Sequence, residues 1–259
     1  MSSLPIILTM KWGTVFSPDY VNVLYNACMK ASRREFRFVC LTDDSIGLNP
    51  KIEHYSIPDI GLTHDEWYSK GVWPKISLYS QDMHNLEGRC LFIDLDMMVL
   101  RDLDSFFEFP EPFVTTDMGP SWRPGGGTAP PEAGTSIFAF NLGQEKQILD
   151  QFLSNKDEIK TKYINEQQFV GKYASSMAYW PPGWVISFKR WLRQPIPKDL
   201  FIPPHRPPPQ AKILAFHGTP RPAGLLKSGL NFWDRFPHMG NGRVDWVADY
   251  WQRNGGCLP

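Results

Sequence analysis

The sequence predicts an α/β protein built on one open mixed sheet with helices on both faces. In the first half of the 259 residues, short apolar runs typical of buried strands alternate with helical patterns. Polar residues follow several of these runs, at the strand ends where open α/β sheets bind their ligands. A chain of this length suits one large domain, so we expect a single domain over residues 1–259.

The same patterns place the individual elements. The expected strands are residues 5–10, 36–41, 51–57, 89–95, 113–116, 135–141 and 212–216. The expected helices are residues 17–34, 71–83, 144–154, 165–173 and 243–253. Ser17 is the expected N-cap of the first helix and Pro18 its first residue, because proline fits the first helical turn.

Two acidic residues lie at the end of the expected strand 89–95. Asp94 and Asp96 interrupt the apolar run from Leu91 to Leu100. An unpaired buried carboxylate is costly, so a cation is expected beside these side chains. The expected cation is Mg2+ or Mn2+ bound to a diphosphate, because hard cations prefer carboxylate and phosphate oxygens. The alternative is a solvated surface turn, which the flanking apolar residues disfavour.

Composition indicates a globular protein and gives no case for nucleic acid as a bulk partner. Hydrophobic residues make up 42% of the chain and charged residues 21%. Lys+Arg and Asp+Glu both number 27, so the net charge does not favour binding to a polyanion.

Cysteine usage and the N-terminal residues favour a cytoplasmic location. Cys28, Cys40 and Cys90 lie in apolar patterns and are expected as buried free thiols, as in a reducing compartment. The first residues lack the basic region of a signal peptide, and no run reaches the roughly 18 apolar residues of a membrane span. A peripheral position at a membrane stays open.

The loop after the first strand is a candidate nucleobase site. Thr9, Lys11, Trp12 and Gly13 lie at the expected ligand edge, where backbone groups could contact a base. Trp12 or Tyr20 could stack on that base, although Trp12 could equally be a core or hinge residue.

Lys75 lies in the expected helix 71–83, before the strand that ends in the aspartates. A lysine there could bind phosphate as a point charge. The alternative is a surface lysine whose apolar stem packs on the protein while its ammonium reaches water.

Polar groups also follow later elements. Glu166 and Gln167 begin the expected helix 165–173, where they could hold sugar hydroxyls or simply cap the helix. His217 follows the last strand in a Gly/Pro turn with Arg221. This histidine could ligate a metal or make an ordinary structural hydrogen bond.

The segment 119–134, just after Asp117, is rich in glycine and proline. A long loop without regular structure is usually functional or disordered. It could be a mobile lid that excludes water from the site, or a passive surface excursion.

The order of these elements resembles the bacterial family-8-like glycosyltransferases, which are retaining enzymes of the GT-A fold with a DxD motif. That family has a nucleotide-reading first loop, a helix lysine, the Asp-x-Asp pair, an acidic–Gln pair and a late His in a Gly/Pro turn. The corresponding positions, in the family's order over about four-fifths of the chain, are residues 9–13, Lys75, Asp94, Asp96, Glu166, Gln167, His217 and Arg221.

The resemblance implies a hexosyltransferase-like enzyme that moves a sugar from a nucleotide-diphosphate sugar, expected to be UDP-linked, to an acceptor hydroxyl with retention. It implies a Rossmann-like nucleotide-sugar-binding half over residues 1–100 and a sugar and acceptor half over residues 101–259. The acceptor is left open, with a glycan or a lipid-linked glycan among the candidates.

The resemblance also implies roles for single residues. Mn2+ or Mg2+ would bind to Asp94, Asp96 and His217, and Asp94 would also touch the ribose. Lys75 and Arg221 would contact the diphosphate. The expected groups around the donor sugar are Asp117, Glu166 and Gln167.

Two other function classes stay open. A haloacid-dehalogenase-type phosphatase also ends an apolar strand with Asp-x-Asp, and Asp94 would then be the nucleophile. That motif normally lies near the N-terminus, whereas a long segment precedes it here. The other class is an inactive protein that binds nucleotide sugars or glycans.

Overall fold

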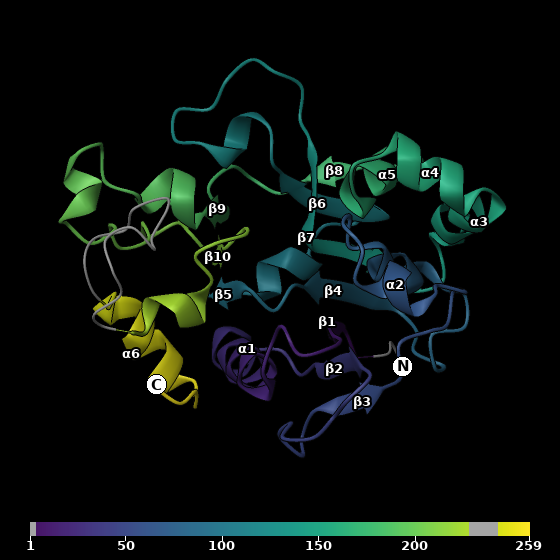
Figure 1. Cartoon of the computed structure of the whole chain (residues 1–259), viewed down its shortest axis with the longest axis horizontal. Coiled ribbons are helices and arrows are strands. Elements are labelled where there is room, and N and C mark those ends of the chain that lie inside the picture. Colours follow the sequence, from purple (N-terminus) through teal and green to yellow (C-terminus); the bar gives the residue numbers. More distant parts are fainter. Residues whose placement is uncertain (1–3, 228–242) are drawn as a thin grey trace.

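Two β-sheets of unequal size organise the chain (Figure 1). The computed structural model describes residues 4–227 and 243–259. The larger sheet has seven strands in the order β3-β2-β1-β4-β7-β6-β8, and the smaller has the order β5-β10-β9. The strands are β1 (Ile6–Lys11), β2 (Arg37–Thr42), β3 (Glu53–Tyr55), β4 (Arg89–Ile93), β5 (Met97–Val99), β6 (Phe113–Asp117), β7 (Ala133–Asn141), β8 (Ala178–Tyr179), β9 (Val185–Ser187) and β10 (Ile213–Ala215).

The larger sheet is mixed, as predicted. β1 pairs in parallel with β2 and β4, and β2 pairs in parallel with β3. β7 runs antiparallel to both β4 and β6. The carboxyl ends of β1, β2 and β4 therefore lie at one edge, which is where ligands bind in such sheets.

Helices cover both faces of the larger sheet, which confirms the predicted fold class. The α-helices are α1 (Pro18–Ala31), α2 (His64–Trp67), α3 (Lys146–Ser154), α4 (Lys156–Lys162), α5 (Glu166–Tyr173) and α6 (Asp245–Arg253). The short helical turns are η1 (Trp73–Tyr79), η2 (Asp104–Phe107), η3 (Pro120–Trp122), η4 (Phe188–Leu192), η5 (Lys198–Leu200) and η6 (Pro222–Leu225). In Figure 1, α1 and α6 lie on one side of the sheet and α3, α4 and α5 on the other.

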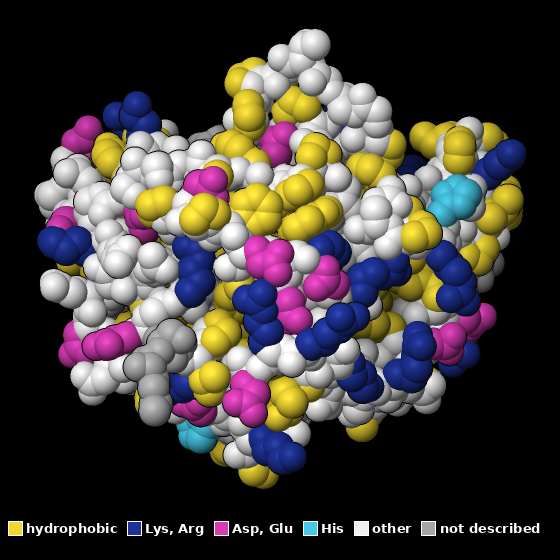
Figure 2. Space-filling model, turned by 180° about the vertical axis from the view of Figure 1, so that it is seen from behind, with side chains coloured by type: hydrophobic (Ala, Val, Ile, Leu, Met, Phe, Trp, Pro, Cys, Tyr) yellow, Lys and Arg dark blue, Asp and Glu magenta, His cyan; other side chains and the backbone are white. Residues whose placement is uncertain are grey.

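Successive side chains of each buried strand point to opposite faces of the sheet, so the strands contribute to two separate apolar layers. Ile7 of β1 packs in a layer with α1, α6 and the smaller sheet, while Ile6 and Leu8 pack in the layer under η1, α3 and α5. Each strand can be apolar throughout because both of its faces are covered. At the surface, Figure 2 shows Lys and Arg side chains among Asp and Glu side chains on the face seen from behind Figure 1.

The predicted helix 71–83 is wrong in type and length. The structure has the 3-10 helix η1, which begins at Trp73 because Gly71 and Val72 adopt positive φ angles of 107° and 58°. Every side chain of η1 is buried, so packing on all sides overrides the helical pattern read from the sequence.

The smaller sheet was not predicted. The chain leaves β4 at Ile93 and enters β5 at Met97, so the segment with Asp94 and Asp96 crosses from one sheet to the other. Three-residue strands such as β5 and β9 carry too little periodicity to be recognised from sequence.

The predicted buried thiols are confirmed: Cys28, Cys40 and Cys90 are buried and free. None of the helices formed by residues 4–227 and 243–259 has the length and hydropathy that crossing a membrane requires.

Candidate functional site

The two aspartates lie at the junction between the sheets. Asp94 N donates to Ser136 O on β7 (2.9 Å), and Met97 N donates back to Asp94 O (3.2 Å), which closes a turn between β4 and β5. Phe216 N, just after β10, donates to Asp96 O (3.2 Å). Backbone hydrogen bonds from both sheets thus hold the Asp-x-Asp segment in place.

Lys75 lies beneath Asp94 in a buried ion group. Its Nζ is 3.1 Å from Asp94 Oδ2, 3.4 Å from Glu166 Oε1 and 2.7 Å from Thr135 O. Burial opposes its charge, but the carboxylates of Asp94 and Glu166 raise the pKa of Lys75 above its ordinary value. Protein oxygens thus surround the ammonium of Lys75, for which the family resemblance predicts a diphosphate contact.

Glu166 belongs to this same group. Its Oε1 accepts a hydrogen bond from Thr135 Oγ1 (2.7 Å), and its side chain is 6% exposed. Burial raises the pKa of Glu166, while Lys75 and the Thr135 hydroxyl oppose that rise. The structure therefore turns this carboxylate toward the interior.

Among the described residues, no lysine or arginine forms an ion pair with Asp96 as Lys75 does with Asp94. Burial and, next, the charge of Asp94 raise the pKa of Asp96 to about 7, while Lys75 and Arg221 only partly oppose the rise. Burial also raises the pKa of Asp94 in spite of Lys75. When two neighbouring carboxyl groups are difficult to ionise at the same time, a cation bound between or beside them is favoured.

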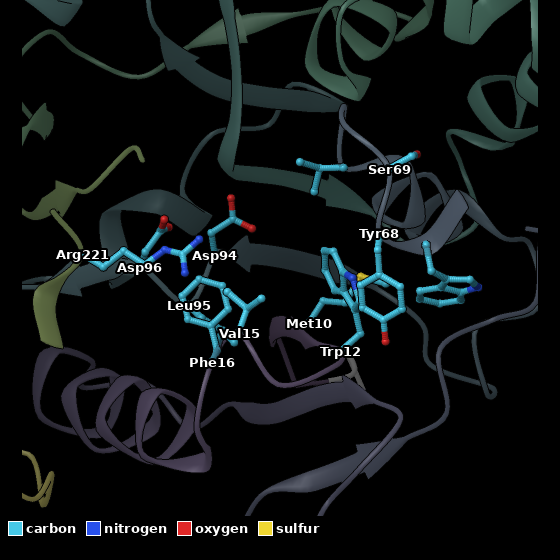
Figure 3. Close-up of a pocket in the computed structure, with 12 residues that line it drawn as sticks. Met10, Trp12, Val15, Phe16, Tyr68, Ser69, Asp94, Leu95, Asp96 and Arg221 are labelled. Atoms are coloured by element: carbon cyan, nitrogen blue, oxygen red, sulfur yellow. The ribbon is translucent and has the colours of Figure 1, made fainter. Parts of the chain in front are cut away.

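A cavity of about 390 Å³ opens in front of these aspartates. Its lining residues are Met10, Trp12, Val15, Phe16, Trp67, Tyr68, Ser69, Val72, Asp94, Leu95, Asp96 and Arg221. Figure 3 shows two ends: Asp94, Asp96 and Arg221 at one, Trp12 and Tyr68 at the other. We call this cavity the donor pocket, because the family resemblance predicts a sugar donor beside the two aspartates.

Aromatic side chains shape the uncharged end of the donor pocket. Trp12 follows β1 and meets Trp67 of α2 edge to face, with ring centroids 6.4 Å apart. Gly13 has φ +59°, and a Cβ there would come 2.9 Å from Tyr68 Cε1. Gly13 therefore allows Tyr68 to approach the first loop closely.

The other residues predicted for the base site face elsewhere. Thr9 and Lys11 are buried in β1, and Lys11 Nζ donates to Asp44 O (3.4 Å). Tyr20 is a core residue on α1, where its ring meets Trp251 at 4.9 Å and its hydroxyl accepts from Ala223 N (3.3 Å). Of the two predicted stacking residues, Trp12 alone lines the donor pocket.

Asp117 holds the two ends of the loop 119–134 together. Its Oδ1 accepts from Gly119 N (2.7 Å) and Glu132 N (3.0 Å), and its Oδ2 accepts from Ser121 Oγ (2.7 Å). Burial works against the charge, but these hydrogen bonds hold the pKa of Asp117 below its ordinary value. The carboxylate thus acts on the loop in this structure.

Gln167 lies apart from the aspartates. It lines a second pocket of about 270 Å³ with Pro131, Glu132, Ala133, Gln168, Gly171 and Tyr179. The structure therefore does not bring Gln167 into the donor pocket with Asp94 and Asp96.

His217 lies next to the Asp-x-Asp segment but bonds to the protein. Its Nε2 is 2.7 Å from Ser187 Oγ, and its ring is 5.7 Å from that of Trp122. Burial, with the charges of Lys189 and Arg190, lowers the pKa of His217 to about 4, so the ring is neutral at neutral pH. Within the described ranges, no three His, Cys, Asp or Glu side chains gather as a ready-made metal site.

The donor set still fits a divalent cation in part. Asp94 and Asp96 supply carboxylate oxygens, the ligand type that Mg2+ and Mn2+ prefer. The pKa values of both carboxyl groups are raised, so a cation bound beside them would stabilise their ionised forms. His217 would join the predicted ligand set through Nδ1 while Nε2 stays with Ser187, or through Nε2 if that contact breaks.

The aromatic residues at the C-terminal end of α2, Trp67 and the C-cap Tyr68, were missed by sequence reasoning. Trp67 and Tyr68 lie in a region without a clear periodic pattern. The available signal was the capping box of Thr63 and Glu66, which marks a helix start just before them. Lys156 and Lys160 bind Glu66 and tie this short helix to α4.

Comparison with solved structures shows the fold to be that of GT-A glycosyltransferases. The galactosyltransferase LgtC, crystallised with donor and acceptor sugar analogues, matches with a TM-score of 0.56 and 12% identity over 93% of this chain and 98% of its own. GlyE of Streptococcus pneumoniae TIGR4 matches with a TM-score of 0.57 and 11% identity, and this chain spans 62% of its length. The bifunctional glycosyltransferase WbbM matches with a TM-score of 0.54 and 12% identity, covering 97% of this chain and 52% of WbbM.

Sequence comparison adds no relative. No protein family model matches the chain, and no curated protein matches it. The fold class thus follows from the structure alone.

Proposed function

We propose that the protein is a glycosyltransferase that moves a hexosyl group from a UDP-linked sugar to an acceptor hydroxyl. The observation that carries this proposal is the donor pocket with its two unlike ends. A nucleoside diphosphate has the same division, since its base is flat and aromatic and its diphosphate is anionic. Trp12 and Tyr68 would pack against the base, and the charged end would take the diphosphate.

The charged end has the groups that a diphosphate leaving group needs. Arg221 lines the pocket beside Asp96, and its guanidinium also lies over the Phe16 ring at 4.6 Å. A guanidinium held in this way can donate to two phosphate oxygens at once. Asp94 and Asp96 would hold Mn2+ or Mg2+, which would supply Lewis-acid stabilisation of the leaving diphosphate.

Lys75 and Glu166 take a positioning role in this proposal. Lys75 fixes the Asp94 carboxylate from below, and Glu166 with Thr135 fixes the ammonium of Lys75. A carboxylate held by buried partners keeps its direction toward the pocket without a ligand present.

The proposed roles of Asp117, Gln167 and His217 need contacts beyond those that these side chains make in this structure. Asp117 and His217 are bonded to the loop 119–134 and to Ser187. Gln167 lines the neighbouring pocket and is partly exposed. We retain them as proposed sugar and metal contacts that would form when donor and metal order the site.

Retention of configuration, a glycan or lipid-linked glycan acceptor and a cytoplasmic place of action complete the proposal. Retention rests on the family resemblance, and the acceptor stays open, with a glycan and a lipid-linked glycan as the candidates. The location rests on the buried free thiols of Cys28, Cys40 and Cys90.

A product assay tests the proposed reaction. UDP-sugars are incubated with the protein and Mn2+, and UDP and inorganic phosphate are measured separately. Slow release of UDP, lost in Asp96→Asn, is expected because transferases hydrolyse their donors slowly without an acceptor. Release of phosphate alone would instead indicate a phosphatase that uses Asp94 as nucleophile.

A further inference from the structure

A compact loop with an apolar outer surface follows η4. We call residues 193–206 the apolar loop. Its two ends lie side by side, because His205 N donates to Leu192 O (2.8 Å) and Gln194 Nε2 donates to Pro203 O (3.1 Å). A loop closed in this way is an Ω-loop, and such loops are frequently functional. In Figure 1 it belongs to the green lobe beyond β9, on the opposite side of the molecule from α3 and α4.

Large hydrophobic side chains of the apolar loop face solvent. Ile196 is 77% exposed, Phe201 73% and Ile202 44%. The exposed prolines beside them are Pro195, Pro197 and Pro203. Figure 2 shows hydrophobic side chains at the corresponding upper right edge, with Lys and Arg side chains beside them. A single exposed hydrophobic residue is ordinary, whereas several in one short loop indicate a surface that meets a protein or a membrane.

Hydrogen bonds inside the apolar loop keep these side chains outward. Asp199 N donates to Pro195 O (3.1 Å), and Ile202 N donates to Lys198 O (2.9 Å), so two successive turns join the hydrophobic positions. The buried Asp199 carboxylate accepts from Arg193 Nε (2.7 Å) within the loop. Turning the hydrophobic side chains inward would break these bonds, so the loop itself maintains their exposure.

α6 fixes the base of the apolar loop. Trp246 Nε1 on that helix donates to Pro204 O (3.4 Å), and the Trp246 ring lies 6.1 Å from that of Phe188 in η4. The loop is therefore attached to the folded core at its base and free of it at its hydrophobic tip.

The exposed lysine and arginine side chains of the apolar loop favour an anionic lipid surface as its partner. Lys198 and Arg206 are exposed, whereas the one carboxylate of the loop, Asp199, is buried against Arg193. Hydrophobic side chains bordered by cations match the boundary between acyl chains and anionic headgroups. A two-fold contact with a second copy would instead bring the same cations of both loops together, which charge repulsion disfavours.

We propose that the apolar loop docks the protein on an anionic lipid bilayer, with Ile196, Phe201 and Ile202 among the acyl chains and Lys198 and Arg206 at the headgroups. Of the described residues that line the donor pocket, none belongs to the apolar loop. The docking surface therefore does not depend on the proposed reaction.

Co-sedimentation with vesicles made of equal parts of phosphatidylcholine and phosphatidylglycerol tests the hydrophobic contacts. Wild-type protein should bind, and Ile196→Ser/Phe201→Ser should weaken the partition into vesicles by about tenfold or more. The control Ile46→Ser/Ile164→Ser removes side chains that are 80% and 76% exposed on other loops, and should leave the partition within about twofold. All these side chains are exposed, so both variants should keep the wild-type melting temperature.

A second pair of variants tests the headgroup contacts. Lys198→Gln/Arg206→Gln should weaken the partition by about tenfold or more, because each cation near an anionic membrane contributes to binding. Arg33→Gln/Lys51→Gln removes the same charge from exposed side chains elsewhere and should stay within about twofold. Wild-type protein should also bind vesicles of phosphatidylcholine alone more weakly, and equal binding to both vesicle types would contradict an anionic surface.

Two results would overturn the docking surface altogether. One is wild-type protein that stays in the supernatant, and the other is an unchanged partition in Ile196→Ser/Phe201→Ser. Analytical ultracentrifugation without vesicles identifies the competing partner. A dimer that Ile196→Ser/Phe201→Ser converts to a monomer, in a protein that does not bind vesicles, would assign the apolar loop to a second copy of the chain.

Binding of UDP with Mn2+ to the same variants separates this proposal from the proposed reaction. Ile196→Ser/Phe201→Ser should bind UDP as wild type does, because the apolar loop lies outside the donor pocket. If UDP fails to bind to wild type while vesicle binding still depends on Ile196 and Phe201, the donor site is wrong and the lipid surface stands.

Discussion

Lys75 Nζ lies 3.1 Å from Asp94 Oδ2, beneath the charged end of the donor pocket. Because of this contact, the two aspartates of the Asp-x-Asp segment differ in their electrostatic surroundings. Asp94 has a cation fixed in the protein, whereas Asp96 faces the pocket with a pKa of about 7 and no such partner. The bound cation that we propose would therefore be needed chiefly at Asp96.

Lys75→Met should destabilise the protein by roughly 3 kcal/mol or more, because Asp94 and Glu166 are left buried without their cation. Urea unfolding measures this loss. Lys75→Met/Glu166→Gln should recover part of it by removing one of the stranded charges. As a control, Lys146→Met breaks an exposed pair with Asp150 and should cost less than about 0.5 kcal/mol.

Asp96→Asn should stabilise the metal-free protein, and more so as the pH rises. Folding raises the pKa of Asp96 from 3.8 to about 7, so the folded state holds its proton and loses stability as the pH rises between these values. The gain from the substitution should be small at about pH 4 and reach roughly 1 to 3 kcal/mol at about pH 8. Thermal unfolding at both pH values measures it. A gain that does not change with pH would show that Asp96 is not the titrating group.

Gly13→Ala should lower both stability and UDP affinity. The added Cβ would come 2.9 Å from Tyr68 Cε1 at a residue with φ +59°, so backbone strain and a displaced ring both follow. We expect a loss of roughly 1 kcal/mol in unfolding free energy. Gly13→Ala/Tyr68→Ala removes the clash and should lose less stability than the sum of its single variants. Strict additivity would mean that Tyr68 does not contact the first loop.

Asp117→Ala should release the loop 119–134. The substitution removes the acceptor for Gly119 N, Ser121 Oγ and Glu132 N. Limited digestion with endoproteinase Glu-C should then cut faster after the exposed Glu132 than in wild type. Ser121→Ala, which removes one hydroxyl, should have a smaller effect. Equal cleavage in all three proteins would show that Asp117 does not control the loop.

The sequence predicted the charged end of the pocket because a general rule places it. Polar residues that follow the strands of an α/β sheet meet at one edge, which was enough to select Asp94 and Asp96. The same rule selected Trp12, which follows β1 and lines the uncharged end. Arg221 was selected from the family resemblance and does line the pocket.

The rest of the site depends on packing between distant segments. The contact of Lys75 with Glu166 joins residues 91 positions apart in sequence, and no local pattern signals that α5 covers η1. Gln167, the next residue on α5, faces another pocket, because neighbouring residues on a helix point in different directions. The aromatic pair Trp67 and Tyr68 reaches the pocket through a four-residue helix too short to show periodicity.

Binding of UDP with and without Mn2+ tests the central claim most directly. Differential scanning fluorimetry on wild type and Asp96→Asn gives the shift in melting temperature for UDP alone, Mn2+ alone and both together. We predict that both together raise the melting temperature of wild type by more than the sum of the separate shifts, and that Asp96→Asn loses this excess. Equal stabilisation by UDP with and without Mn2+, or an unchanged excess in Asp96→Asn, would contradict a metal-bound nucleotide at the Asp94–Asp96 end of the donor pocket.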